Sequence, residues 1–180
     1  MIEGFAAFAA WLGVSLVVLS DGRRGLAAGI ALATVGLAPL SLQAGGLAGA
    51  AALATGGAIA TVRRAMTGPP GWGIMPPGST PRLVLCVAGG ILALWLGVAV
   101  MPGNAGALRF AVMAVAGLGG ARLISSDGQE IVETAVSALA LAVAAGTALA
   151  PASPGVWPYL AAALVAAAAT WIPNKETRAA

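Results

Sequence analysis

Residues 25–62, GLAAGIALATVGLAPLSLQAGGLAGAAALATGGAIATV, contain no charged side chain. A membrane-spanning helix needs about 20 apolar residues, so this stretch is about twice as long as one span. Pro39 ends a helix, and the pair Gly45-Gly46 permits the chain to turn. We therefore expect two helices, at about 25–39 and 46–62, joined by a reversal near residues 39–45.

Charged and Pro/Gly-rich segments on both sides of this stretch delimit further apolar runs of similar length. Asp21-Gly22-Arg23-Arg24 precedes it, and Arg63-Arg64 follows it. The pattern predicts an all-α fold, a polytopic transmembrane bundle of about seven helices that forms a single domain over residues 1–180. The expected helices cover residues 4–20, 25–39, 46–62, 83–101, 106–124, 130–150 and 157–172.

The composition indicates an integral membrane protein. Of the 180 residues, 59% are hydrophobic and 8% are charged, whereas soluble domains average about 45–50% apolar and about 25% charged. The first apolar run begins after Glu3 and lacks the basic residues of a signal peptide, so we expect it to be retained as a helix. The expected environment is the lipid bilayer of the cytoplasmic (plasma, or cell inner) membrane, crossed several times.

The basic residues predict an orientation with the N-terminus outside and the C-terminus inside. With seven spans, eight of the nine basic residues fall on one side, and cytoplasmic loops carry the excess of Lys and Arg. Only Arg109 falls near the outer side, where we expect it to snorkel outward. The formal net charge of +3 then reflects topology, so nucleic acid is not an expected partner.

Similar turns suggest an internal parallel repeat of the 3+1+3 type. Ser20-Asp21-Gly22 matches Ser126-Asp127-Gly128, and Leu37-Ala38-Pro39 matches Leu149-Ala150-Pro151. The repeat units would be residues 1–64 and 106–176, with a linker loop (65–82) and a linker helix (83–101) between them. The alternative is two unrelated hairpins with similar turn chemistry.

The linker loop contains Pro69-Pro70, Pro76-Pro77 and Pro81, which exclude a regular helix. Its apolar residues Trp72, Ile74 and Met75 suggest docking on a partner or on the membrane surface. The alternative is an extended linker that crosses under the bundle.

Few residues of the chain are suited to catalysis or to binding a metal or cofactor. Histidine is absent, and Cys86 is the single cysteine, within an apolar run. We expect Cys86 to be a small buried or lipid-facing residue. No Ser/His/Asp set, paired-carboxylate site or phosphate-binding glycine loop ending in lysine is present. We therefore predict no catalytic, cofactor-binding or metal-binding residues, and a protein that is not an enzyme.

Arg122 and Glu133 are candidates for a structural ion pair. They lie near the facing ends of the helices expected at 106–124 and 130–150, at similar depth. A short connection makes these two helices antiparallel neighbours. Two alternatives remain: a gate or ion-coupling site, and two independent solvated charges.

Glycine spacing predicts smooth helix faces that allow backbones to approach closely, within the chain or against neighbours. The candidate packing residues are Gly25, Gly29, Gly45, Gly49, Gly117 and Gly120.

The helix order resembles a small membrane component of hydrogenase-4-type complexes, from a family related in style to the K-type subunit of respiratory complex I. The resemblance lies in one helix, Arg23-Arg24, a hairpin ending at Arg63-Arg64, a Pro-bearing connection, one helix and a further three-helix unit. It covers most of the chain in topology and includes no specific motif. Members of that family carry mid-membrane acids, whereas here only Glu130 and Glu133 follow Ser126-Asp127-Gly128, close to the surface. The resemblance implies a place in a complex, and this departure argues against proton conduction.

Two functional hypotheses follow. The first is a non-catalytic membrane subunit that packs against other membrane subunits in a transport or energy-conversion complex. The second is a small-solute transporter with its site between two three-helix units, an arrangement with the helix count of the 3+1+3 sugar carriers. Hydroxyls for such a site would come from Thr34, Thr55, Thr61, Ser137, Thr147 and Thr170, unless each bonds to its own helix backbone.

Overall fold

The computed structural model describes residues 1–100, 103, 105–150 and 155–171, with the backbone alone at residues 43–45. These residues form seven α-helices, which confirms the predicted all-α bundle. They are α1 (Ile2–Leu19), α2 (Arg23–Leu40), α3 (Leu42–Met66), α4 (Thr80–Leu94), α5 (Gly106–Ile124), α6 (Gln129–Gly146) and α7 (Trp157–Ala169). A π-helical segment, η1 (Trp95–Val100), continues α4, and a 3-10 turn, η2 (Thr147–Leu149), continues α6.

The uncharged stretch folds back on itself as predicted. Helix α2 includes Pro39 in its last turn, and Ser41 alone separates it from α3. Gly46 then interrupts α3 with φ 60° and ψ −170°, a conformation that residues with a Cβ rarely adopt. The reversal therefore uses both the proline and the glycine pair on which the prediction rests.

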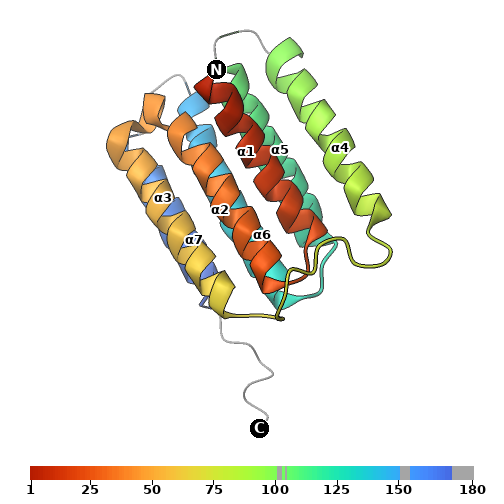
Figure 1. The fold of residues 1–180 in the computed structure, drawn as a ribbon. Coiled ribbons are helices and arrows are strands. Elements are labelled where there is room, and N and C mark those ends of the chain that lie inside the picture. Colours follow the sequence, from red (N-terminus) through yellow and green to blue (C-terminus); the bar gives the residue numbers. More distant parts are fainter. Residues whose placement is uncertain (101–102, 104, 151–154, 172–180) are drawn as a thin grey trace.

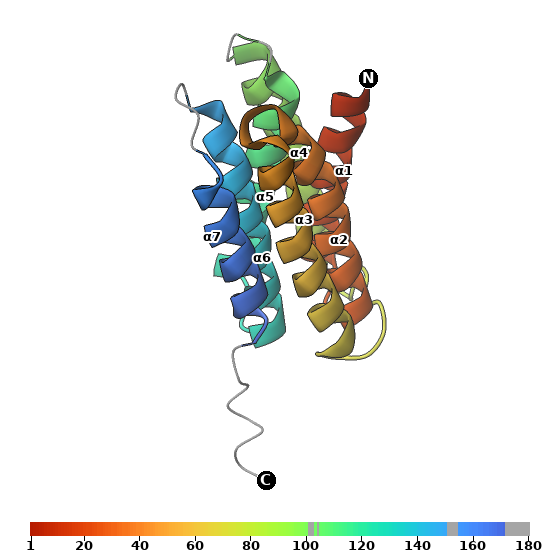
Figure 2. The same cartoon turned by 90° about the vertical axis from the view of Figure 1, so that its left-hand side faces the viewer.

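The helices form two layers of three, with α4 at one edge (Figures 1 and 2). In the first layer α2 lies between α1 and α3, and in the second α6 lies between α5 and α7. Helix α1 packs on α5, α2 on α6 and α3 on α7. Helix α4 packs mainly on α5, beside α1.

The two layers therefore stack in the same order, with the first helix of one against the first helix of the other. A two-fold axis along the bundle would instead place α1 opposite α7. The helix order is that of two layers related by a translation, and the internal repeat itself stays a prediction.

Within the described residues, four helical segments are long and apolar enough to cross a membrane: Ile2–Leu19, Thr80–Val100, Gly106–Ile124 and Gln129–Leu149. Seven membrane-spanning helices were predicted from the sequence, and four of them are this long and apolar. Helices α2 and α3 are long enough, but each carries two arginines and several glycines. Helix α7 has 13 described residues, which span only about 20 Å of the roughly 30 Å hydrocarbon layer. Met101 and Ile172, where two helices were predicted to end, lie outside the described residues.

Alanine and glycine bring α1 and α2 close together. A Cβ at Gly13 would overlap the backbone of Ala33, and a Cβ at Gly36 would overlap the backbone of Ala10. Ala10 and Ala33 are fully buried at the same interface. Close backbone packing of this kind is a main source of association between helices in lipid, which supplies little hydrophobic driving force between them.

Candidate functional site

One end of the bundle gathers most of the charged side chains. Helices α1, α3, α5 and α7 finish there, and α2, α4 and α6 begin there (Figure 1). We call this the charged end. Its arginines are Arg23, Arg24, Arg63, Arg64, Arg82 and Arg122, and its acidic residues are Asp21, Asp127, Glu130 and Glu133. Among the described residues, Arg109 is the one basic side chain toward the other end.

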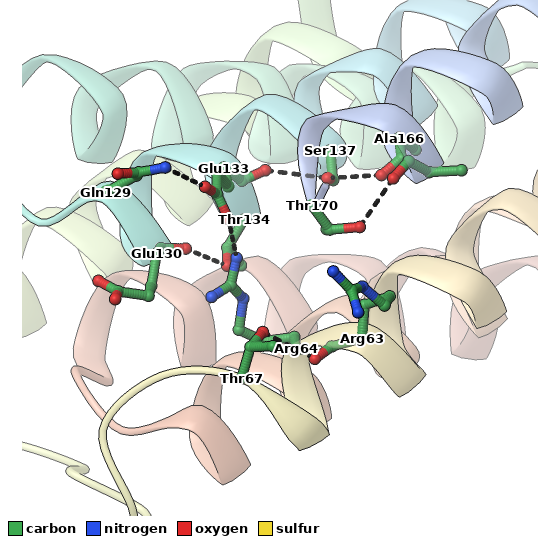
Figure 3. Close-up of polar contacts among 11 residues, drawn as sticks. Arg63, Arg64, Thr67, Gln129, Glu130, Glu133, Thr134, Ser137, Ala166 and Thr170 are labelled. Atoms are coloured by element: carbon green, nitrogen blue, oxygen red, sulfur yellow. Dashed lines mark hydrogen bonds and ion pairs between the residues drawn. The ribbon is translucent and has the colours of Figure 1, made fainter. Parts of the chain in front are cut away.

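A buried ion pair joins the two layers at this end. Arg64 Nη2, on the last turns of α3, donates to Glu133 Oε2 on α6 at 2.7 Å. The Arg64 side chain is fully buried, and that of Glu133 is 9% exposed. Gln129 Nε2, one turn earlier on α6, donates to the other carboxylate oxygen of Glu133 at 2.8 Å (Figure 3). Both oxygens of Glu133 therefore have donors, as a buried carboxylate requires.

Next to this pair, α6 is tied to α7. Ser137 Oγ lies 2.9 Å from the carbonyl oxygen of Glu133 and 3.0 Å from that of Ala166 (Figure 3). At the end of α7, the guanidinium of Arg63 lies 4.1 Å from the centre of the Trp171 ring. This is a cation–π distance, so α3 contacts α7 through Arg63 and α6 through Arg64.

A second group of charges centres on Asp21, in the turn between α1 and α2. Arg122 of α5 donates to Asp21 Oδ1 and, at 3.2 Å, to the carbonyl oxygen of Ser20. Arg82 of α4 contacts both carboxylate oxygens of Asp21, at 3.1 and 3.2 Å. Arg122 is 2% exposed, whereas Arg82 and Asp21 are 36% and 37% exposed. One carboxylate thus links α1, α4 and α5.

The predicted pairing of Arg122 with Glu133 is wrong, because each of these residues has a different partner. Their similar depth follows from helix rise and loop length, as argued from the sequence. Their directions differ, since Arg122 faces α1 and Glu133 faces α3. The sequence pattern indicates only turn and topology roles for Asp21 and Arg64. Both residues border an apolar run, where a charged side chain needs a partner or water. That position is the sequence feature that could have identified them.

The loop between α3 and α4, residues 67–79, is fixed against the α1–α2 turn. Backbone hydrogen bonds join Arg23 N to Pro69 O (2.9 Å), Arg24 N to Gly71 O (3.1 Å), Asp21 N to Gly73 O (3.1 Å) and Met75 N to Leu19 O (2.9 Å). The first two carbonyls cap the N-terminus of α2, whose N–H groups have no partners within the helix. The extended linker that crosses at the charged end is therefore an ordered part of that end.

The glycines predicted to pack fall into three groups. Gly25, Gly29 and Gly49 lie close to other parts of the chain: Gly25 near Ser20 and Trp72, Gly29 near Val17, and Gly49 against the ring of Tyr159. Gly117 and Gly120 have no heavy atom within 4 Å of the position of a Cβ, so they do not pack within the chain. The surroundings of Gly45 lie outside the described part.

Arg109 does not simply extend to the outer surface. Its Nε donates to the carbonyl oxygen of Gly97 and its Nη2 to that of Gly103, each at 3.0 Å. Gly97 belongs to η1, where the π-helical turn alters the regular hydrogen-bond pattern. Arg109 therefore joins the start of α5 to the end of the α4 span.

The hydroxyl groups considered for a solute path bond to backbone carbonyls of their own segments. The acceptors are Ile30 for Thr34, Ala51 for Thr55, Gly57 for Thr61, Glu133 for Ser137, Ala144 for Thr147 and Ala167 for Thr170. Cys86 is buried, with Sγ 3.9 Å from the carbonyl oxygen of Ser15. Within the described ranges, no three His, Cys, Asp or Glu side chains come together as metal ligands would.

Apolar hollows open on the surface of the bundle. One of about 370 Å³ lies between α4 and α5, and one of about 420 Å³ lies between α3 and α7. The first is lined by Leu85, Gly89, Leu92, Ala93, Leu96, Met113, Ala114, Gly117 and Leu118. We call it the α4–α5 groove. Gly117, where an added Cβ would meet no atom within 4 Å, lies in this groove.

The fold and the charged end define a helical protein with segments apolar enough to cross a membrane, whose layers are joined by a buried ion pair and a second, partly exposed one. Comparisons with protein-family models, curated proteins and solved structures found no match. The resemblance to a small membrane component of hydrogenase-4-type complexes therefore remains a prediction.

Proposed function

We propose that this protein is a non-catalytic subunit of a larger membrane complex for transport or energy conversion. The α4–α5 groove carries the proposal. Small residues, among them Gly89, Ala93, Ala114 and Gly117, form part of its lining, and Gly117 is itself exposed there. A transmembrane helix of a partner can approach such a surface closely, and this favours association in lipid.

The position of α4 supports the same proposal. In an apolar 18-residue window of the span Thr80–Val100, 22% is buried, whereas 50% is buried in that of the span Gln129–Leu149. Apolar side chains such as Val84, Ile91 and Leu92 are more than half exposed. This helix is held to the bundle by α5 and α1 on one side only, and its free side would complete an interface with another subunit.

We further propose that all seven helices cross the cytoplasmic membrane, with the N-terminus outside and the C-terminus inside. Helices α2, α3 and α7 lie alongside the four membrane-spanning segments in the same bundle (Figure 2). The arginines of the charged end would then face the cytoplasm, as the distribution of basic residues in membrane proteins favours. The class of complex expected from the sequence, a hydrogenase-4-type assembly, is part of this proposal.

The alternative is a small-solute transporter with its site between the two layers. It would need polar groups that face a path through the bundle. The hydroxyls available for this bond to their own helices, and the side chains between the layers at mid-depth include buried Val14, Val115, Ala138 and Leu141. We therefore favour the subunit.

A substitution in the groove tests the proposal. A Cβ added at Gly117 would meet no atom within 4 Å, so we expect Gly117→Leu to be accommodated while its side chain occupies the groove and blocks a partner helix. The tagged protein, expressed at native level in its own host and purified in a mild detergent, should carry one defined partner chain. Gly117→Leu should lose that chain.

The matched control is Gly4→Leu, which also meets open space but lies far from the groove. It should retain the partner at the wild-type ratio. A stable, solitary chain of 17.4 kDa in the wild-type preparation would refute the proposal, and so would equal recovery of the partner with both variants.

A further inference from the structure

The α3–α4 loop presents apolar side chains in a fixed arrangement. Trp72, Ile74 and Met75 are 53%, 45% and 48% exposed, although the backbone around them is hydrogen-bonded to the α1–α2 turn. An antiparallel bridge between Ser20 and Ile74 lies within this stretch. Large apolar groups on an ordered segment, rather than on a free tail, indicate a surface that contacts something other than water.

The backbone at Met75 has a conformation that L-residues rarely adopt. Its φ is 52°, in the left-handed region, and it is the one described residue other than glycine with a positive φ. Such a conformation persists only where the surrounding structure holds it. Here the holding contact is the Met75 N–H bond to the carbonyl of Leu19 at 2.9 Å.

The loop lies where the edge of the bilayer would be. In both views it lies beside the first turn of α2 and the last turn of α3, and Figure 2 shows it on the outer side of the α1–α3 layer rather than between the layers. The exposed Arg24 and the half-exposed Arg82 flank it at the same end. Arginines beside an exposed tryptophan are typical of the headgroup zone of a membrane, where tryptophan is enriched.

The proline content of the loop suits this zone. Pro69, Pro70, Pro76 and Pro77 have no backbone N–H, and the carbonyls of Pro69, Gly71 and Gly73 already accept hydrogen bonds. Irregular backbone is costly in a poorly hydrated region because its polar groups need partners. This loop has fewer such groups than an ordinary loop of its length.

We propose that the α3–α4 loop is a membrane-interface anchor, in which Trp72, Ile74 and Met75 insert into the headgroup–acyl boundary of the bilayer that surrounds the bundle. The exposed Arg24 beside it contacts lipid phosphate. The loop sets the depth of the charged end and stabilises α4 at the edge of the bundle. This inference does not depend on the protein being a subunit of a complex.

Spin labels in lipid nanodiscs test the depth of the loop. The single cysteine allows a Cys86→Ala background into which Trp72→Cys, Ile74→Cys or Met75→Cys is introduced and labelled with a nitroxide. Access to oxygen relative to a water-soluble nickel chelate then reports immersion. We expect this ratio to be severalfold higher at the three loop sites than at Asp127→Cys, an exposed turn site at the same end. Val84→Cys, on the exposed face of α4, provides the lipid-immersed reference.

If the labelled loop sites give the same ratio of oxygen to nickel-chelate access as the Asp127→Cys site, the proposal is overturned, because the loop would then face water. Loop labels that both reagents fail to reach would also overturn it, since protein would then cover the loop. If the cysteine variants do not fold, the native protein is used with Trp72→Phe alone. The emission lost in Trp72→Phe isolates Trp72 from the other four tryptophans. Brominated acyl chains should reduce this difference in emission, and a difference that they leave unchanged would contradict the anchor.

Discussion

The guanidinium of Arg64 donates to the carboxylate of Glu133 at 2.7 Å, from a side chain that is fully buried between the two helix layers. It joins residues that are 69 positions apart in the sequence. Breaking a buried pair by removing one charge costs about 3–5 kcal/mol, because the other charge is left without compensation. The relationship therefore makes stability depend strongly on both residues.

We predict that Glu133→Met and Arg64→Met each destabilise the protein by about 3 kcal/mol, while the double variant Arg64→Met/Glu133→Met costs clearly less than the sum. Reversible unfolding in mixed micelles measures this. Asp127→Asn, at an exposed turn, serves as the control and should change stability by less than about 0.5 kcal/mol. Strict additivity of the two substitutions would rule out the pair.

Substitutions at Arg122 and Glu133 should by contrast be additive. Arg122→Met removes a contact with Asp21 and Glu133→Met removes one with Arg64, and the two ion pairs share no residue. Independent sites usually add within about 0.5 kcal/mol. A larger coupling energy in the same unfolding assay would mean that the two residues interact directly.

Loss of the Asp21 carboxylate should destabilise the protein more than is usual for a side chain that is 37% exposed. Asp21→Asn leaves the buried Arg122 without its counter-ion and should cost about 2–4 kcal/mol. Arg82→Met removes only the more exposed of the two contacts and should cost less than about 1 kcal/mol. Similar losses from both variants, measured as unfolding free energies, would contradict this ranking.

Two glycine substitutions should have opposite effects. Gly13→Ala places a methyl group against the backbone of Ala33 and should destabilise by about 2 kcal/mol or more, as overpacking does. Gly117→Ala meets open space and should stabilise by up to about 1 kcal/mol, because alanine favours the helix over glycine. Thermal unfolding of the isolated chain distinguishes them, and a Gly13→Ala variant as stable as the wild type would contradict the α1–α2 packing.

Arg109→Met should loosen the connection between η1 and α5. It removes the donors to the carbonyls of Gly97 and Gly103, and each unsatisfied group costs about 1–3 kcal/mol unless water replaces the donor. Hydrogen exchange should become faster in residues 95–110 and remain unchanged at the charged end. Arg109→Lys should have an intermediate effect because a single ammonium replaces the two-armed guanidinium.

Reporter fusions test the proposed orientation. A fusion after Arg64 should report the cytoplasm, and a fusion within residues 151–155 should report the exterior, as the positive-inside rule predicts. A cytoplasmic signal from both positions would show that the number of crossings between them is even.

Several features of the fold could be read from the chain alone because they depend on local chemistry. The uncharged stretch 25–62 is too long for one span, and Pro39 and Gly46 determine where it folds back. Apolar runs bordered by charges located the helices to within a few residues. The break at η1 was not predicted, since it depends on Gly97 packing against Phe110 and on the hydrogen bond from Arg109.

The partners of the charges were decided by tertiary structure. Helix rise places Arg122 and Glu133 at similar depth, but the direction of a side chain around its helix has meaning only relative to the neighbouring helices. The layer order placed α1 beside α5 and brought α3 within reach of α6, so Asp21 met Arg122 and Arg64 met Glu133. Tertiary structure also decided which glycines pack. The sequence does not distinguish Gly29 from Gly117, but Gly29 is buried and Gly117 is open. Sequence thus determined which residues lie at each membrane depth, and the association of the helices determined which of them touch.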